Sequence, residues 1–97
     1  MEFFAKSKST NISVYISDSK KGDKTIILLH GYLETIYIWE DFREYLKDYR
    51  TIAIDLPGHG LTTSHPESNS MELCADVVKD VMEICNVSKA VVAGHSM

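Results

Sequence analysis

Cysteine is scarce in this chain of 97 residues, which contains only Cys74 and Cys85. The two fall eleven positions apart in the sequence and on one predicted helix. At 1.5 Å per residue, roughly 16 Å of helix axis separates them, which is too far for a disulfide. Two free thiols indicate a reducing compartment, and we expect the protein in the cytoplasm.

Long apolar runs and clustered basic residues are also missing. No segment approaches the roughly 20 apolar residues of a membrane span, and the segment 1–6 lacks the basic and then apolar order of a signal peptide. A formal net charge of −4 argues against a nucleic-acid partner. The four histidines show no metal-binding spacing and the carboxylates are dispersed. We therefore expect no membrane, nucleic-acid or metal partner, while the oligomeric state stays open.

The composition that remains is that of a globular protein. Hydrophobic residues make up 44% of the chain and charged residues 25%, which excludes a disordered or fibrous chain. The length would suffice for one small domain. The sequence stops, however, inside a predicted strand–turn–helix junction with no polar tail, so we expect an N-terminal piece of a longer protein.

Strands and helices alternate along most of the chain. Apolar alternation or unbroken apolar runs predict strands over 3–8, 11–17, 25–29, 51–56 and 89–93. Helical spacing predicts one helix around Trp39, Phe42 and Leu46, with Arg43 on its solvated face, and a second over 71–85. The first two strands form a hairpin, and the alternation that follows predicts right-handed βαβ units with a parallel sheet.

Small-residue turns follow three of the predicted strands, at 30–32, 55–60 and 94–97. Ligands of open α/β sheets bind outside the carboxyl ends of the strands, so all three turns lie on the functional side. The last turn, a Gly-x-Ser directly after a buried strand, is how a nucleophile elbow begins. We expect Gly94 there because the tight turn brings backbones close enough to exclude a Cβ.

Taken together, these motifs resemble the N-terminal portion of the α/β-hydrolase fold superfamily. The resemblance rests on His30-Gly31 after a strand, Trp39 eight residues beyond that glycine, Asp-Leu-Pro-Gly-His-Gly over 55–60 and Gly-His-Ser-Met over 94–97. It implies an α/β fold in which a hairpin precedes a parallel βαβαβ sheet with flanking helices and ends at the nucleophile elbow. A complete domain of this kind needs roughly 200–250 residues. We therefore expect residues 1–97 to be the N-terminal portion of a single domain.

The resemblance also implies roles for individual residues. Ser96 is the expected nucleophile, and the backbone N–H groups of Tyr32 and Met97 are the expected oxyanion hole. The base and acid that activate such a serine come later in the family's chain order, beyond residue 97. The expected supporting residues of the two loops are His30, Gly31, Gly94 and His95. His30 is interpreted as a brace for its loop, and Asp55 and His59 as loop scaffold.

The resulting hypothesis is a serine-dependent hydrolase, without metal or organic cofactor, that acts on a small carboxylic ester or related acyl substrate. Ser96 would form an acyl-enzyme that water then hydrolyses. Two alternatives stay open. The same fold also carries lyases, C–C bond hydrolases and cofactor-free synthases. The isolated 97 residues, which lack the acid and base and leave the last strand with an exposed apolar edge, would be an inactive, aggregation-prone fragment.

Overall fold

A computed structural model describes residues 1–31, 33–64 and 70–95. The strands are β1 (Glu2–Lys6), β2 (Ser13–Asp18), β3 (Thr25–Leu29), β4 (Arg50–Ile54) and β5 (Val91–Gly94). The helical elements are η1 (Ile36–Trp39), α1 (Glu40–Arg43), η2 (Glu44–Leu46) and α2 (Met71–Ile84). Strand β3 has the predicted bounds, and the other strands and α2 differ from prediction by a few residues at their ends.

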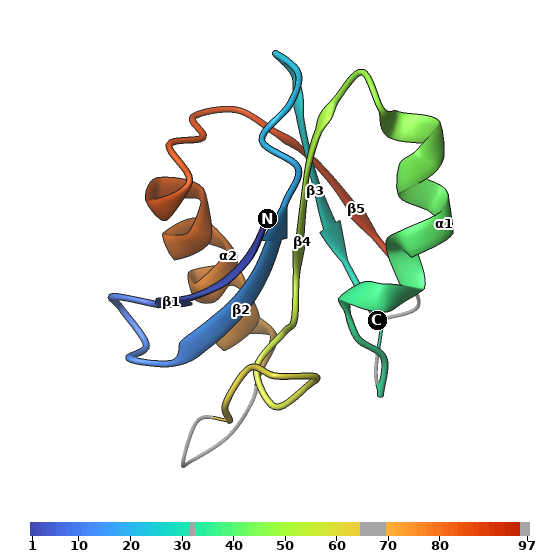
Figure 1. The fold of residues 1–97 in the computed structure, drawn as a ribbon. Coiled ribbons are helices and arrows are strands. Elements are labelled where there is room, and N and C mark those ends of the chain that lie inside the picture. Colours follow the sequence, from blue (N-terminus) through green and yellow to red (C-terminus); the bar gives the residue numbers. More distant parts are fainter. Residues whose placement is uncertain (32, 65–69, 96–97) are drawn as a thin grey trace.

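The five strands form one mixed sheet in the order β1-β2-β4-β3-β5. Strands β1, β2 and β4 pair antiparallel, whereas β3 pairs parallel with both β4 and β5. The segment η1-α1-η2 and helix α2 lie on opposite faces of the sheet (Figure 1). The predicted hairpin followed by a parallel βαβαβ unit is therefore confirmed.

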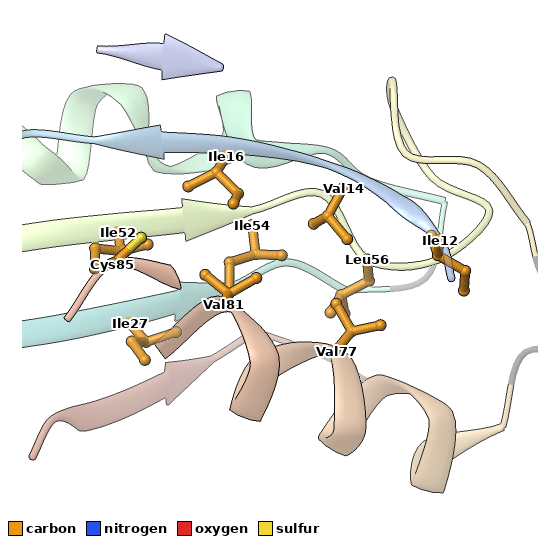
Figure 2. Packing of buried hydrophobic residues seen from close by; sticks show 10 residues of the cluster. All are labelled: Ile12, Val14, Ile16, Ile27, Ile52, Ile54, Leu56, Val77, Val81 and Cys85. Carbon is orange, nitrogen blue, oxygen red and sulfur yellow. The ribbon is translucent and has the colours of Figure 1, made fainter. Parts of the chain in front are cut away.

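The core has two parts because the sheet is covered on both faces. The larger part packs between the sheet and α2, as Figure 2 shows, and consists of Ile12, Val14, Ile16, Ile27, Ile52, Ile54, Leu56, Val77, Val81 and Cys85. The smaller part consists of Leu28, Ile36, Trp39 and Ala53. Ile27 and Leu28 are adjacent in β3 and each is fully buried on a different face. This is the environment that an unbroken apolar strand requires.

The first helical segment differs from the prediction of a single helix. Two 3₁₀ segments flank only four α-helical residues, so Trp39 is buried while Phe42 is 46% exposed. Arg43, expected in solvent, instead turns to the sheet, where its Nε donates to Thr51 Oγ1 at 2.9 Å and its Nη1 donates to Ser17 Oγ at 2.8 Å. The polar strand residues on this face need hydrogen-bond partners when the helical segment covers them, and the guanidinium of Arg43 supplies several N–H donors. The solvated position predicted for Arg43 is therefore wrong.

Helix α2 follows the predicted apolar pattern and has one polar addition. Ser70 caps it by accepting a hydrogen bond from the Leu73 N–H at 3.1 Å, and Asn86, just after the helix, takes a left-handed conformation with φ of 60°. Asp80 is buried and faces the turn between β1 and β2. Its Oδ2 accepts from Ser7 Oγ at 2.5 Å, from the Ser9 N–H at 2.9 Å and from Ser9 Oγ at 2.7 Å. These bonds fasten the hairpin to the helix.

We predict that Asp80→Asn destabilises the protein in a pH-dependent way. Burial opposes ionisation of Asp80, but the hydrogen bonds from Ser7 and Ser9 outweigh it and hold the pKa below the ordinary 3.8. A lowered pKa in the folded state stabilises the protein above the unfolded-state pKa, and this contribution is lost as the pH falls through the folded-state value. The free energy of unfolding at pH 7 should fall by about 1–3 kcal/mol.

Denaturant unfolding of the whole protein at pH 7 and at pH 3 measures this effect. The difference in free energy of unfolding between wild type and Asp80→Asn should be smaller at pH 3 than at pH 7. Asp76→Asn, on the exposed side of the same helix, is the matched control and should change little at either pH. An equal loss for both variants would contradict the role given to Asp80.

Candidate functional site

The turns after β3 and β5 lie next to each other, at the carboxyl-terminal ends of these two parallel strands. Leu29 of β3 is in register with Gly94 of β5, and the His95 N–H donates to the Leu29 carbonyl at 3.1 Å. The strands that lead to His30 and His95 are therefore neighbours in the sheet. Ser96, Tyr32 and Met97, the predicted nucleophile and oxyanion donors, lie outside the described residues. The site is therefore built from the residues that flank them.

His30 links the turn after β3 to the loop after β4. It is fully buried, its Nε2 accepts a hydrogen bond from the Leu56 N–H at 2.9 Å, and its Nδ1 lies 2.7 Å from the Gly31 carbonyl oxygen. A backbone N–H can only donate, so Nε2 is the acceptor and Nδ1 carries the proton. Burial lowers the pKa of His30 and outweighs the opposing contribution of the Gly31 carbonyl. Both ring nitrogens of a neutral imidazole are thus used for structure.

Glu34 joins the turn after β3 to the turn after β5, and the sequence reasoning missed it. One oxygen, Oε1, accepts from the Gly31 N–H at 2.6 Å and lies 3.0 Å from His95 Nδ1. Hydrogen bonds from His95 and then from Gly31 lower the pKa of Glu34. His95 itself is exposed, and its ring lies edge-on to Trp39 with centroids 6.4 Å apart. The available signal was a glutamate three residues after Gly31, a spacing at which a carboxylate can reach back to a backbone N–H, as in a capping box.

Asp55 holds the loop after β4 with both carboxylate oxygens. Oδ1 accepts from the Ile36 N–H at 2.8 Å and Oδ2 from the Leu61 N–H at 3.0 Å. Gly60 is needed beside it: its φ is +53°, and a Cβ there would lie 2.2 Å from Asp55 Oδ2. The Asp-Leu-Pro-Gly-His-Gly motif therefore forms a loop that its own first residue, Asp55, stabilises by hydrogen bonds, and Gly60 leaves room for the Asp55 carboxylate.

Gly94 does not show the close approach that we expected of it. Its φ is outside the left-handed region, and within the described part of the chain a Cβ on Gly94 would meet no atom within 4 Å. The steric requirement proposed for this glycine is not supported by residues 1–31, 33–64 and 70–95.

Two apolar grooves lie near these turns. One, of about 430 Å³, lies beside Gly31 and Leu33 and is floored by Leu56, Met71 and Cys74. The other, of about 470 Å³, runs between α2 and β5. Strand β5 is at the edge of the sheet, where Val91 is 66% and Val92 52% exposed. The exposed apolar edge expected for the last strand is thus present, and the groove at Gly31 is wide enough for a small acyl group.

The described residues contain no group of three or more His, Cys, Asp and Glu side chains arranged to hold a metal ion. Among the same residues, none of the helices has the length and apolar character needed to cross a bilayer.

Comparison with known proteins identifies similar sequences. Residues 24–97 match the model of the alpha/beta hydrolase fold family. Epoxide hydrolase 4 of Mus musculus is 33% identical over 84 residues, which cover 84% of this chain and 23% of that protein. The 2-hydroxy-6-oxononadienedioate/2-hydroxy-6-oxononatrienedioate hydrolase of Escherichia coli is 30% identical over 92 residues, which cover 89% of this chain and 32% of that protein. The chain thus spans between about a quarter and a third of the length of these curated relatives.

Solved structures show the same fold. Epoxide hydrolase VrEH1 from Vigna radiata superposes with a TM-score of 0.87 at 22% identity, covering 99% of this chain and 30% of that one. A predicted CIB-like hydrolase from Thermoplasma acidophilum superposes with a TM-score of 0.83 at 25% identity, covering 100% of this chain and 51% of that one. Identity below 25% supports the fold alone, so the first of these matches supports no statement about substrate.

We predict opposite outcomes for alanine at the two glycines of the turns. Gly60→Ala forces a left-handed alanine against a buried carboxylate and should cost at least about 2 kcal/mol of unfolding free energy. Gly94→Ala, which meets open space in the described structure, should change stability by less than about 0.5 kcal/mol. Thermal unfolding of the two variants of the whole protein tests both. A Gly94→Ala loss as large as that of Gly60→Ala would show a steric constraint on Gly94 that the described residues do not contain.

Proposed function

The chain belongs to the alpha/beta hydrolase fold family, and from that membership we propose that the whole protein is a hydrolase of small carboxylic esters or related acyl substrates with Ser96 as its nucleophile. The observation that carries the proposal is the pairing of β5 with β3. It brings the turn that leads to Ser96 beside the turn that leads to Tyr32. A nucleophile and an oxyanion donor are needed at one such point in acyl transfer.

In the proposed reaction, Ser96 Oγ attacks the acyl carbon and the carbonyl oxygen becomes negative. The N–H groups of Tyr32 and Met97 bind that oxygen, and losing one such donor typically costs about 3–4 kcal/mol of transition-state stabilisation. Collapse of the tetrahedral intermediate expels the alcohol and leaves an ester on Ser96. Water then attacks this ester, releases the acid and restores the hydroxyl.

The base and acid of this mechanism are proposed to lie outside residues 1–97. Both nitrogens of His30 bind main-chain groups, and His95 Nδ1 is bound to Glu34. The family's chain order also places both groups after the nucleophile. The chain covers only 23% and 32% of the lengths of two relatives, which is consistent with a base and an acid outside residues 1–97. We propose accordingly that the 97 residues alone are inactive.

The nucleophile favours an acyl substrate over an epoxide, although two of the similar proteins are named epoxide hydrolases. A serine oxygen that opens an epoxide ring forms an ether. An ether has no carbonyl carbon for water to attack, so the enzyme would stay alkylated after one turnover. A serine that attacks an acyl group forms an ester, which a positioned water hydrolyses. Serine at position 96 therefore supports ester or other acyl chemistry.

A second candidate is hydrolysis of a carbon–carbon bond next to a ketone. It is favoured by the 30% identity to the Escherichia coli hydrolase. The substrate in that protein's name has hydroxyl, oxo and carboxylate groups on an unsaturated chain but no ester or amide. Hydrolysis within such a molecule cleaves a carbon–carbon bond. Ser96 and the oxyanion donors would serve this chemistry as well, because it too places negative charge on a carbonyl oxygen.

Labelling with a fluorophosphonate probe tests the proposal on the whole protein. Wild type should be labelled on the peptide that carries Ser96, and Ser96→Ala should not be labelled. Turnover of short p-nitrophenyl esters, measured beside cleavage of a vinylogous 1,5-diketone acid, separates the two candidates. Absence of labelling in folded wild type, or equal labelling of Ser96→Ala, would contradict Ser96 as the nucleophile.

A further inference from the structure

Strand β1 has one edge that no described strand covers. It is an outer strand of the sheet and pairs only with β2 among the described strands (Figure 1). Near its start, Met1 and Asp18 exchange two main-chain hydrogen bonds, each of 2.8 Å. Just beyond its end, the Ser7 N–H donates to the Ile12 carbonyl at 2.8 Å. Bonded and non-bonded residue pairs alternate along an antiparallel ladder, so these two points fix which residues of β1 bond to β2.

The main-chain groups of Glu2, Phe4 and Lys6 point away from β2. The register of the ladder makes Phe3 and Ala5 the residues that bond to β2, and it places the other three at the non-bonded positions. The N–H and C=O groups of these three residues therefore lie along the open edge. Their side chains are all exposed and lie on the same face of the sheet, because side chains alternate along a strand.

The sequence of this edge is complementary to itself. Glu2 and Lys6 carry opposite charges and lie two residues on either side of Phe4. When two copies of the strand pair antiparallel about Phe4, Glu2 of each copy is opposite Lys6 of the other. The outward N–H and C=O groups of the three residues then meet as hydrogen-bonded pairs. Parallel pairing in register would instead place like charges opposite each other, which is unfavourable.

The side chains of this edge can form these contacts. Glu2 Oε1 accepts from the hydroxyl of Tyr15 and, at 3.1 Å, from the hydroxyl of Tyr37. These bonds lower the pKa of Glu2, and they leave its second oxygen for an ion pair. Lys6 makes no ion pair within the described part of the chain. Phe4 is 55% exposed, and its ring centroid lies 4.9 Å from that of Tyr15. A second copy would thus cover an exposed aromatic surface.

We propose that β1 is an interface at which two copies of this chain pair, with their β1 strands antiparallel about Phe4. The two sheets then continue into each other across a twofold axis. Main-chain hydrogen bonds hold the strands together, as in other cases of strand addition, and the contacts between Glu2 and Lys6 set direction and register. A lysine on an edge strand commonly prevents such pairing. Here the glutamate at the symmetric position makes Lys6 attractive to a second copy.

Sedimentation velocity of the whole protein over a concentration series measures this association. One strand from each copy is a small contact, so wild type should form a reversible dimer as its concentration rises. Glu2→Lys and Lys6→Glu should each weaken the dimer by about tenfold or more, because each places like charges opposite each other at two points. An equimolar mixture of the two variants should recover the wild-type affinity, since opposite charges face each other again in the mixed dimer.

Two variants of the central residue separate the main chain from the side chain. Phe4→Pro removes the outward N–H at the centre of the interface and keeps the bonds of β1 to β2, which come from Phe3 and Ala5. Proline is tolerated in an edge strand where the N–H faces solvent. Phe4→Ala, the matched control, loses the ring and keeps the N–H. Phe4→Pro should abolish the dimer, whereas Phe4→Ala should retain a weakened one, with both variants folded by thermal unfolding.

Three results would overturn the interface. They are a wild type that stays monomeric throughout the series, a dimer that neither the charge reversals nor Phe4→Pro affects, and a mixture that does not recover the dimer. If a charge variant does not fold, amide hydrogen exchange of wild type at low and high concentration decides. Slower exchange at Glu2, Phe4 and Lys6 at high concentration supports the interface, and unchanged exchange excludes it. None of these measurements depends on the reaction proposed for Ser96.

Discussion

Parallel pairing of β3 on both of its edges is the constraint on which the rest of this structure depends. It places the ends of β4, β3 and β5 side by side at one edge of the sheet. The loops that follow the three strands therefore meet, although the strands end at Leu29, Ile54 and Gly94, far apart in the chain. The two layers of helix serve this arrangement by burying both faces of β3, with Ile27 on one side and Leu28 on the other.

The loops that follow β3, β4 and β5 are held by side chains, of which His30 and Asp55 are buried and Glu34 is half-buried. Asp55 and His30 each bind main-chain groups from two segments, and Glu34 binds the Gly31 N–H and the His95 side chain. A buried backbone N–H without a partner costs about as much as a lost hydrogen bond. Each of these side chains thus stabilises a non-repetitive conformation of the loops that follow β3, β4 and β5.

The acyl chemistry proposed for the site follows from the hydroxyl oxygen of the predicted nucleophile, Ser96. The fold is shared with proteins named for epoxides and with one named for an unsaturated oxo-dicarboxylate. A fold of this kind supports many reactions, so the substrate has to be argued from the site. A serine oxygen would form a hydrolysable ester with an acyl group but a stable ether with an epoxide, and this is the basis of the acyl chemistry proposed for Ser96. The edge of β5 and the groove beside α2 are exposed apolar surfaces in the described residues.

The sequence by itself determined the order of strands and helices, the parallel sheet and the three turns, because apolar periodicity and small-residue turns are local signals. Only the tertiary structure decided what Arg43, Glu34 and Asp80 do. Each is a charged residue that local pattern assigns to solvent or leaves unassigned, and each binds a polar group of another segment: Asp80 binds Ser7, Arg43 binds Ser17, and Glu34 binds His95. The same holds for the tautomer of His30, which depends on the N–H of Leu56 in a neighbouring loop. Partners distant in sequence leave no trace in local spacing, so their contacts became visible only when the sheet had brought the loops together.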